Sequence, residues 1–222
     1  MGDEGTDTEE TQKELDELER QLIEMGNMVE SLFADSVVAL MENDWGAETE
    51  LREEDYRAHE WWLKIDKLCV DLLCNRKLNA DQVRFVSATI KIASALKRTA
   101  DQSLHIGETI RSFELESLPD AGSLAPVASM VELTQNMLGD VIEALVNHNA
   151  QEAAGLHLVF RELASLDARA VDELGEAMLN GRVPVHLGTG FVRAVQRLQH
   201  VGNEVLDIAN QLCHVYGRGP QQ

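Results

Sequence analysis

The side chains best suited to holding a metal ion lie in two short stretches of the chain. Asp101 is followed at i+4 by His105, and His200 is followed at i+7 by Asp207. On a helix, residues four apart share a face, and a carboxylate beside an imidazole can bind borderline divalent cations. A single pair of this kind is more often a surface contact or a cap. We therefore keep Asp101 and His105 as candidate metal ligands beside that simpler interpretation.

Known catalytic patterns are missing from the sequence. A di-iron bundle would need Glu-x-x-His on two helices and a zinc protease would need H-E-x-x-H, and neither occurs. No G-x-S-x-G turn is found. Gly188 and Gly190 enclose one threonine but lack the third glycine and the preceding strand of a dinucleotide-binding loop. We therefore expect a protein that is not an enzyme.

The charge of the chain restricts its partners. Acidic residues outnumber basic ones 39 to 19, which gives a formal net charge of -20. No stretch gathers Lys and Arg as a nucleic-acid footprint would, so we expect no nucleic-acid partner. The same charge opposes the attraction of free orthophosphate, and no phosphate-binding G-x-x-x-x-G-K loop is present. If the protein responds to phosphate, we expect it to do so indirectly.

Cysteine usage and hydropathy bear on the compartment. Cys69, Cys74 and Cys213 form no C-x-x-C pair and lie in apolar helical segments, so we predict reduced thiols in the core. The chain has no run of 18 apolar residues, and its start has neither a basic nor an apolar leader region. We expect a cytoplasmic protein without membrane insertion.

The candidate residues must be positioned by helices, because apolar residues recur every three or four positions along the chain. In the second segment this period places Tyr56, His59 and Trp62 on the buried face. The other faces look polar, so no dimer seam stands out, although a homodimer stays open. The six periodic segments run from Leu15 to Leu40, Tyr56 to Leu72, Val83 to Leu104, Val127 to Leu145, Leu156 to Leu174 and Phe191 to Val215.

Local signals divide these segments into two halves. Asn79 and Gln82 form a capping-box pattern, and helices should stop near Asn43, at 147–149 and near 180–181. The Pro- and Gly-containing stretch near the midpoint marks a boundary. We predict an all-α protein of two tandem three-helix bundles, with six long antiparallel helices. The predicted units are a disordered acidic tail (1–11), a first bundle (12–116), a linker (117–124) and a second bundle (125–217).

The third and sixth helical segments look like copies of one another. Residues 96–101 read L-K-R-T-A-D and residues 198–203 read L-Q-H-V-G-N, an offset of 102 residues that Ile106 and Ile208 also keep. Any two amphipathic helices can be aligned by a suitable offset, but the parallel positions of the loops favour a true duplication.

At these residues the chain resembles the PhoU family, cytoplasmic regulators of phosphate uptake and signalling built from two three-helix bundles. That family carries a pattern close to L-E-R-x-G-D in its third and sixth helices, followed by N-I-A, which 207–209 match as D-I-A. The resemblance covers residues 12–219. Further matching fragments are Met25-Gly26, Val29-Glu30, Ile65-Asp66, Arg84-Phe85-Val86 and Lys91-Ile92.

The resemblance also implies clusters of iron or zinc held by E-x-x-x-D pairs, and here the chain departs from the family. The first pair has become Lys97 and Asp101, and the second has become Gln199 and Asn203. An ammonium and two neutral amides replace anionic ligands, so we expect no metal cofactor. Arg98 and Asp101 survive from the motif, can pair at i and i+3, and are the candidate partner-binding surface.

By resemblance, the expected function is that of a negative regulator of phosphate-starvation signalling and phosphate uptake, acting through protein contacts. The implied partners are a sensor histidine kinase and the ATPase of a phosphate ABC transporter. The alternative is a diverged PhoU-like helical scaffold, or a metal-binding protein, that serves another signalling pathway.

Overall fold

Six long helices make up the chain in the computed structural model, which describes residues 3–109, 119 and 121–217. They are α1 (Asp3–Glu42), α2 (Glu48–Asn75), α3 (Ala80–Glu108), α4 (Ala121–Val146), α5 (Ala150–Leu179) and α6 (Val185–Tyr216), and a 3-10 turn η1 (Trp45–Ala47) precedes α2. None of the described residues is in a strand. The predicted all-α class is confirmed.

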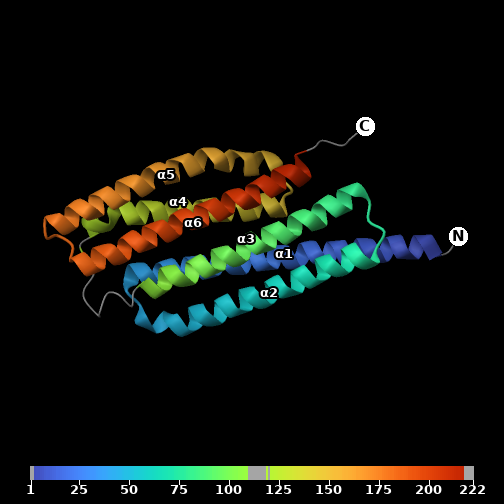
Figure 1. Cartoon of the computed structure of the whole chain (residues 1–222), viewed down its shortest axis with the longest axis horizontal. Helices are drawn as coiled ribbons and strands as arrows, with labels where there is room; N and C mark the ends of the chain where they lie inside the picture. Colours follow the sequence, from blue (N-terminus) through green and yellow to red (C-terminus); the bar gives the residue numbers. More distant parts are fainter. Residues whose placement is uncertain (1–2, 110–118, 120, 218–222) are drawn as a thin grey trace.

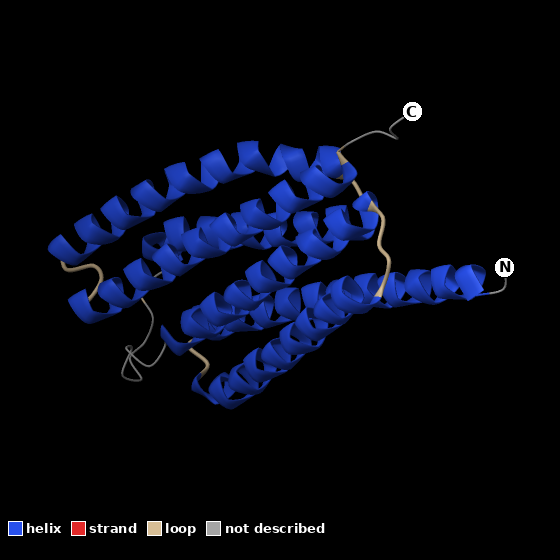
Figure 2. Cartoon of the chain, turned by 45° about the vertical axis from the view of Figure 1, so that its right-hand side comes forward, coloured by secondary structure: helices blue, strands red, loops and turns tan. Residues whose placement is uncertain are grey.

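The helices form two antiparallel three-helix bundles, α1 to α3 and α4 to α6, that lie side by side (Figure 1). Helices α3 and α6 meet along the junction, and α1 also contacts α4. Helices α2 and α5 lie on opposite outer sides, each packed against its own bundle (Figures 1 and 2). The predicted six-helix architecture is therefore confirmed.

Three of the helices end in the same way. Asn43, His148 and Gly181 follow α1, α4 and α5 with positive φ angles of 55°, 52° and 69°. In each case the next residue donates its N–H to a carbonyl five positions back, as from Asp44 to Ala39 at 2.9 Å. The left-handed backbone at this residue ends the helix and brings the next N–H group within hydrogen-bond distance of one of the last helical carbonyls. The predicted stops near 43, 147–149 and 180–181 are confirmed, as is the capping box of Asn79 and Gln82.

The apolar faces of all six helices meet in one continuous core. Leu18, Leu22 and Phe33 from α1 are fully buried, and Phe191 and Leu198 from α6 are buried equally well. Full burial of such a side chain is worth about 1.5–3 kcal/mol relative to exposure. Burial on this scale holds the long helices in fixed register.

A polar contact also joins α1 to the second bundle near the end of α6. His148, in the turn after α4, stacks on Tyr216 near the end of α6 with ring centroids 4.4 Å apart. The carboxylate of Glu19 on α1 contacts the His148 ring and lies 3.4 Å from the Tyr216 hydroxyl. The two bundles are therefore fastened by side chains at two places along the junction.

The predicted tail and linker differ from the structure. α1 begins at Asp3 rather than near residue 12, and Thr11 is buried. Arg76, just after α2, binds Glu14 at 2.7 Å and Glu10 at 3.2 Å, which ties this first part of α1 to the bundle. α4 already includes residues 121–124, and Pro126 lies inside this helix as its sixth residue, where it removes one i→i−4 hydrogen bond. Residues 110–118, which include the predicted end of the first bundle, lie outside the described residues.

The predicted inner face of α2 was partly wrong. Tyr56 is 62% exposed, and the buried positions are Leu51, Ala58, Ile65, Cys69 and Leu72. Cys69 is a core thiol as predicted, and burial, assisted by the nearby charge of Asp66, raises its pKa to about 12. Cys74 is exposed and Cys213 half-buried, so the prediction of three core thiols was wrong for Cys74.

Candidate functional site

The motif residues lie where α3 and α6 cross between the bundles. The helices run antiparallel there, since Arg98 on α3 contacts Glu204 on α6, while Gln102, further along α3, contacts the earlier residue Arg197 on α6. Gln102 and Glu204 keep the repeat offset of 102 residues, and each accepts a hydrogen bond from an arginine of the other bundle. The repeat thus places equivalent acceptors on both sides of the junction.

Lys97 forms an ion-pair bridge between α2 and α3. Its Nζ lies 3.0 Å from Oδ1 of Asp55 and 2.5 Å from Oδ1 of Asp101. The Lys97 side chain is 15% exposed. Burial acts to lower the pKa of Lys97, but the hydrogen bonds to Asp101 and Asp55, together with their charges, raise it above its ordinary value. The group is therefore a fixed cation at neutral pH.

The residues of the first bundle do not fit the metal cluster that the resemblance implies. The ammonium of Lys97 already lies between the carboxylates of Asp55 and Asp101, where it neutralises the charge that a divalent cation would need. Across the described residues, no group of three or more His, Cys, Asp and Glu side chains is placed to hold a metal ion.

The corresponding residues of the second bundle offer no anionic ligand. Asn203 and His200 are exposed. Gln199 is half-buried, and its Oε1 is buried without a hydrogen-bond donor. Neutral amides at 199 and 203 cannot supply the charge of a carboxylate pair, so these residues do not fit a multinuclear cluster either.

Arg98 is bound across the junction rather than along its own helix. Its Nε lies 2.9 Å from both carboxylate oxygens of Glu204, and a terminal nitrogen lies 3.6 Å from Asp207. The hydrogen bond to Glu204 is the main reason that the pKa of Arg98 is raised, with burial opposing it. The expected i, i+3 partner, Asp101, binds Lys97 instead. Both residues of the candidate surface are therefore engaged within the chain.

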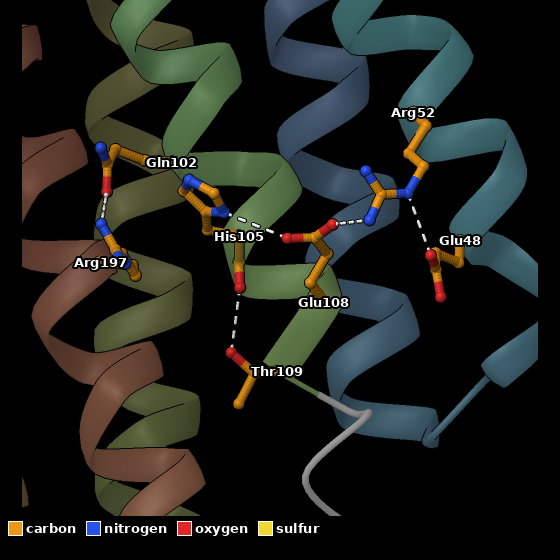
Figure 3. Close-up of polar contacts among 7 residues, drawn as sticks. All are labelled: Glu48, Arg52, Gln102, His105, Glu108, Thr109 and Arg197. Atoms are coloured by element: carbon orange, nitrogen blue, oxygen red, sulfur yellow. Dashed lines mark hydrogen bonds and ion pairs between the residues drawn. The ribbon is translucent and has the colours of Figure 1, made fainter.

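His105 belongs to a second polar group near the end of α3 (Figure 3). Its Nδ1 lies 3.2 Å from Glu108, whose other oxygen contacts Arg52 of α2. Arg52 also binds Glu48 at 3.0 Å. Asp101 and His105, predicted as a metal pair, are thus each bound to a different residue.

Sequence reasoning missed the distant partners in these groups. Asp55 binds Lys97 from 42 positions away and Glu204 binds Arg98 from 106 positions away, and Arg197 binds Gln102, the residue that follows the motif. One signal was available: the repeat offset relates Gln102 to Glu204 and so marks both as candidates for the junction.

No helix in the described part of the chain is long and apolar enough to cross a membrane. The described helices and this polar junction define a protein built from two three-helix bundles. Comparisons with known proteins and solved structures find relatives and a similar fold.

Residues 22–110 match the PhoU domain. The phosphate-specific transport system accessory protein PhoU homolog of Pseudomonas putida is 24% identical over 203 residues, which cover 91% of this chain and 78% of that protein. The phosphate-specific transport system accessory protein PhoU of Serratia marcescens is 29% identical over 145 residues, 65% of this chain and 58% of that protein. The crystal structure of PhoU from Pseudomonas aeruginosa has a TM-score of 0.85 at 23% identity and covers 92% of this chain and 97% of that one. The domain match, the relatives and the structural neighbour all support the PhoU family, which the motif fragments predicted.

Proposed function

We propose that this protein is a cytoplasmic regulatory adaptor of phosphate homeostasis that restrains phosphate-starvation signalling and phosphate uptake through protein contacts. The observation that carries the proposal is the PhoU domain at residues 22–110, together with relatives named as accessory proteins of phosphate-specific transport systems. Its partners are a sensor histidine kinase and the ATPase of a phosphate ABC transporter. The protein itself catalyses no reaction.

The adaptor works without iron or zinc. The ammonium of Lys97 between Asp55 and Asp101 supports this part of the proposal, because it supplies in the folded chain the positive charge that a metal would bring. Phosphate is sensed by the partners. A net charge of -20 repels a phosphate dianion, and the arginines of the junction already bind Glu204 and Gln102.

Gene deletion tests the regulatory role. In phosphate-replete medium, the deletion strain should express phosphate-acquisition genes that the wild type represses, and a plasmid copy should restore repression. Calorimetry with the purified protein and orthophosphate should show no binding. Tight orthophosphate binding would replace the adaptor with a direct sensor.

A charge swap separates structure from recognition at Arg98. Arg98→Glu breaks the pair with Glu204 and should weaken both the junction and any partner contact made by Arg98. The double variant Arg98→Glu/Glu204→Arg restores an opposite-charge pair across the junction but removes the positive charge at position 98 of α3. If the double variant still fails to repress phosphate-acquisition genes, a partner contact at Arg98 is supported. If the double variant represses these genes again, the role of Arg98 is to hold the two bundles together.

The second candidate is a diverged PhoU-like scaffold, or a metal-binding protein, serving another pathway. The departures at Lys97, Gln199 and Asn203 favour it, because residues of the family's motif have changed in both bundles. A deletion that leaves phosphate-acquisition genes repressed, while the protein stays folded and expressed in the wild type, would make this candidate the better account.

A further inference from the structure

Exposed hydrophobic side chains gather on the hairpin formed by α2 and α3. In the described part of the chain ten large hydrophobic side chains are exposed, and five of them belong to these two helices: Tyr56, Leu63, Val70, Leu73 and Val83. The main contacts of α2 are with α1, α3 and η1, so no other described helix covers its outer side (Figures 1 and 2). Apolar side chains gathered on one surface indicate a contact outside the chain.

Three of these side chains point toward the outer side of the hairpin where α2 and α3 meet. Arg52 of α2 binds Glu108 of α3 across this side (Figure 3). Val70 follows Arg52 by 18 residues and Leu63 follows it by 11, so both leave α2 within about 20° of the direction of Arg52. By the same count, Val83 leaves α3 within about 20° of the direction of Glu108. Leu63, Val70 and Val83 therefore share one side of the hairpin.

Leu73 completes this surface where the two helices are joined. Residues 76–79 connect α2 to α3, so Leu73 and Val83 stand on either side of a short turn. From Leu63 to Leu73 the surface is about 15 Å long, at 1.5 Å per residue. We call it the α2–α3 patch, which consists of Leu63, Val70, Leu73 and Val83.

Two lysines stand on the outer edges of the patch. Lys67 on α2 and Lys91 on α3 are exposed, and neither makes an ion pair within the described part of the chain. Leu51 lies against Gly107, where an added Cβ would be 2.5 Å from the leucine side chain. Lys67 is 16 residues after Leu51 and Lys91 is 16 residues before Gly107, so in this antiparallel pair the lysines stand at the same level. Each is turned by about 40–80° from the nearest patch residue of its own helix, away from the other helix.

The charge of the chain is divided unevenly between this hairpin and the rest. Residues 48–108 hold 10 of the 19 bases but only 11 of the 39 acids, which gives them a net charge of -1. The rest of the chain holds 9 bases and 28 acids, a net charge of -19. An acidic partner is repelled by the rest of the chain and not by the hairpin, so charge directs it to the patch.

We propose that the α2–α3 patch binds an amphipathic helix of a partner protein, whose apolar stripe is flanked on both edges by acidic residues. The stripe covers the patch, and the acids on its two edges meet Lys67 and Lys91. The partner thereby adds a fourth helix to the first bundle. The patch is short, so the contact is small and transient. The proposal rests on the adaptor role proposed above, for which it names the binding surface and the chemistry of the partner.

A lipid surface fits these observations less well than a helix. A helix that lies on an anionic membrane carries mainly bases on its polar face. The exposed side of α2 also carries Glu53, Glu60 and Asp71, and the whole chain has a net charge of -20. Vesicles that contain phosphatidylglycerol therefore serve as the competing ligand in the binding test.

Calorimetry with designed peptides tests the chemistry of the partner. One probe is a helix of about 20 residues with Leu at heptad positions a and d and Glu at e and g, and the second has Gln in place of Glu. The acidic peptide should bind about two- to tenfold more tightly than the neutral one, because it gains Lys67 and Lys91. In Lys67→Glu/Lys91→Glu this order should reverse.

Two further variants test the apolar part of the contact. Leu63→Glu should abolish binding of the acidic peptide, and Leu158→Glu, at a 66% exposed position of α5, is the matched control that should bind as the wild type does. No saturable binding of the acidic peptide, equal affinity for the two peptides, or binding to the vesicles alone would overturn the proposal.

Photo-cross-linking in the cell tests the surface itself. A benzophenone amino acid at position 63 or 83 should cross-link to one and the same partner segment, and one at position 158 should not. Mass spectrometry of the cross-linked peptide should show an apolar heptad pattern with acidic flanks. A cross-link to a second copy of this chain, or to a segment without acidic flanks, would overturn the proposal.

Repression of phosphate-acquisition genes separates this proposal from the adaptor role. Leu63→Glu and Val83→Glu should each lose repression, whereas Leu158→Glu should keep it. If deletion of the gene derepresses these genes but both patch variants repress them normally, the patch is not the docking surface and the adaptor role stands. If deletion has no effect, the adaptor role fails, and the peptide titration still decides whether the patch binds an acidic amphipathic helix.

Discussion

Arg98 on α3 binds Glu204 on α6 across the junction of the two bundles, with its Nε 2.9 Å from both carboxylate oxygens. The Glu204 side chain is only 16% exposed, whereas that of Arg98 is 48% exposed. The Glu204 carboxylate is therefore largely shielded from solvent, whereas the Arg98 guanidinium that binds it is partly exposed. A residue kept from the family's motif thus helps to fix the two repeats against each other.

The first prediction concerns the energy of this pair. Arg98→Ala and Glu204→Ala should each lower the free energy of unfolding by about 0.5–1 kcal/mol, and the double variant by less than their sum, because half-exposed ion pairs are weakened by solvent. Urea unfolding of the four proteins gives the coupling energy. Strictly additive losses would show that the contact contributes nothing. Arg20→Ala, which removes pairs within α1 alone, is the control for a lost helix-surface charge.

Acid should loosen the start of α1. Arg76 holds Glu14 through two hydrogen bonds of 3.0 and 2.7 Å. These bonds are the main reason that the pKa of Glu14 is below its ordinary value of 4.5, with burial opposing them and the charge of Arg76 assisting. A lowered folded-state pKa stabilises the fold above the unfolded-state value and loses that effect as the pH falls through the folded value.

The free energy of unfolding of the wild type should therefore exceed that of Glu14→Gln at pH 7, and the difference should shrink as the pH is lowered below 4.5. Glu9→Gln, at an exposed position of the same helix, is the control for the removal of an acidic side chain from α1. A difference that is constant across the acid range would mean that the carboxylate is not linked to folding.

A glycine in the outer helix α5 offers a gain in stability. Nothing lies within 4 Å of a Cβ built at Gly155, and this residue is in the helix interior. Gly155→Ala should raise the free energy of unfolding by about 0.5–1 kcal/mol, since glycine loses more backbone entropy in a helix. Gly202→Ala in α6 should show no such gain, because its Cβ would lie 2.4 Å from the Leu163 side chain. Equal gains at both sites, measured by thermal unfolding, would contradict this account of packing.

The predictable part of the structure was local. Helix ends at Asn43 and Gly181 and the cap at Asn79 depend on residues within one turn, so the sequence contains all the information needed. The partners of Lys97 and Arg98 lie 42 and 106 residues away, and helical spacing cannot show them. Local reasoning therefore paired Arg98 with the nearest acid, Asp101.

The prediction of which face of α2 is buried failed for a different reason. Two apolar lines with the same seven-residue repeat run along this helix, one through Ala58 and one through Leu63. Periodicity reveals a line but does not say whether another part of the chain covers it. Only the packing of α1 and α3 against the Ala58 line separates the core from the exposed line through Leu63.

The last prediction concerns the metal that the chain is proposed to lack. The purified wild type should carry far less than one equivalent of iron or zinc per bundle, because Lys97 provides the positive charge between Asp55 and Asp101.

The variant Lys97→Glu tests this role, because it brings a third carboxylate next to Asp55 and Asp101. Without metal it should destabilise the fold by roughly 1–3 kcal/mol, since like charges replace a shielded ion pair. Added Zn²⁺ should restore stability in proportion to the logarithm of its concentration, and EDTA should reverse the effect. Lys97→Met is the matched control: it removes the ammonium without adding a ligand, so it should be destabilised but not rescued. Thermal unfolding with and without metal distinguishes the three proteins. Equal rescue of Lys97→Met, or stoichiometric metal in the wild type by elemental analysis, would show that Lys97 does not replace a cation at this site.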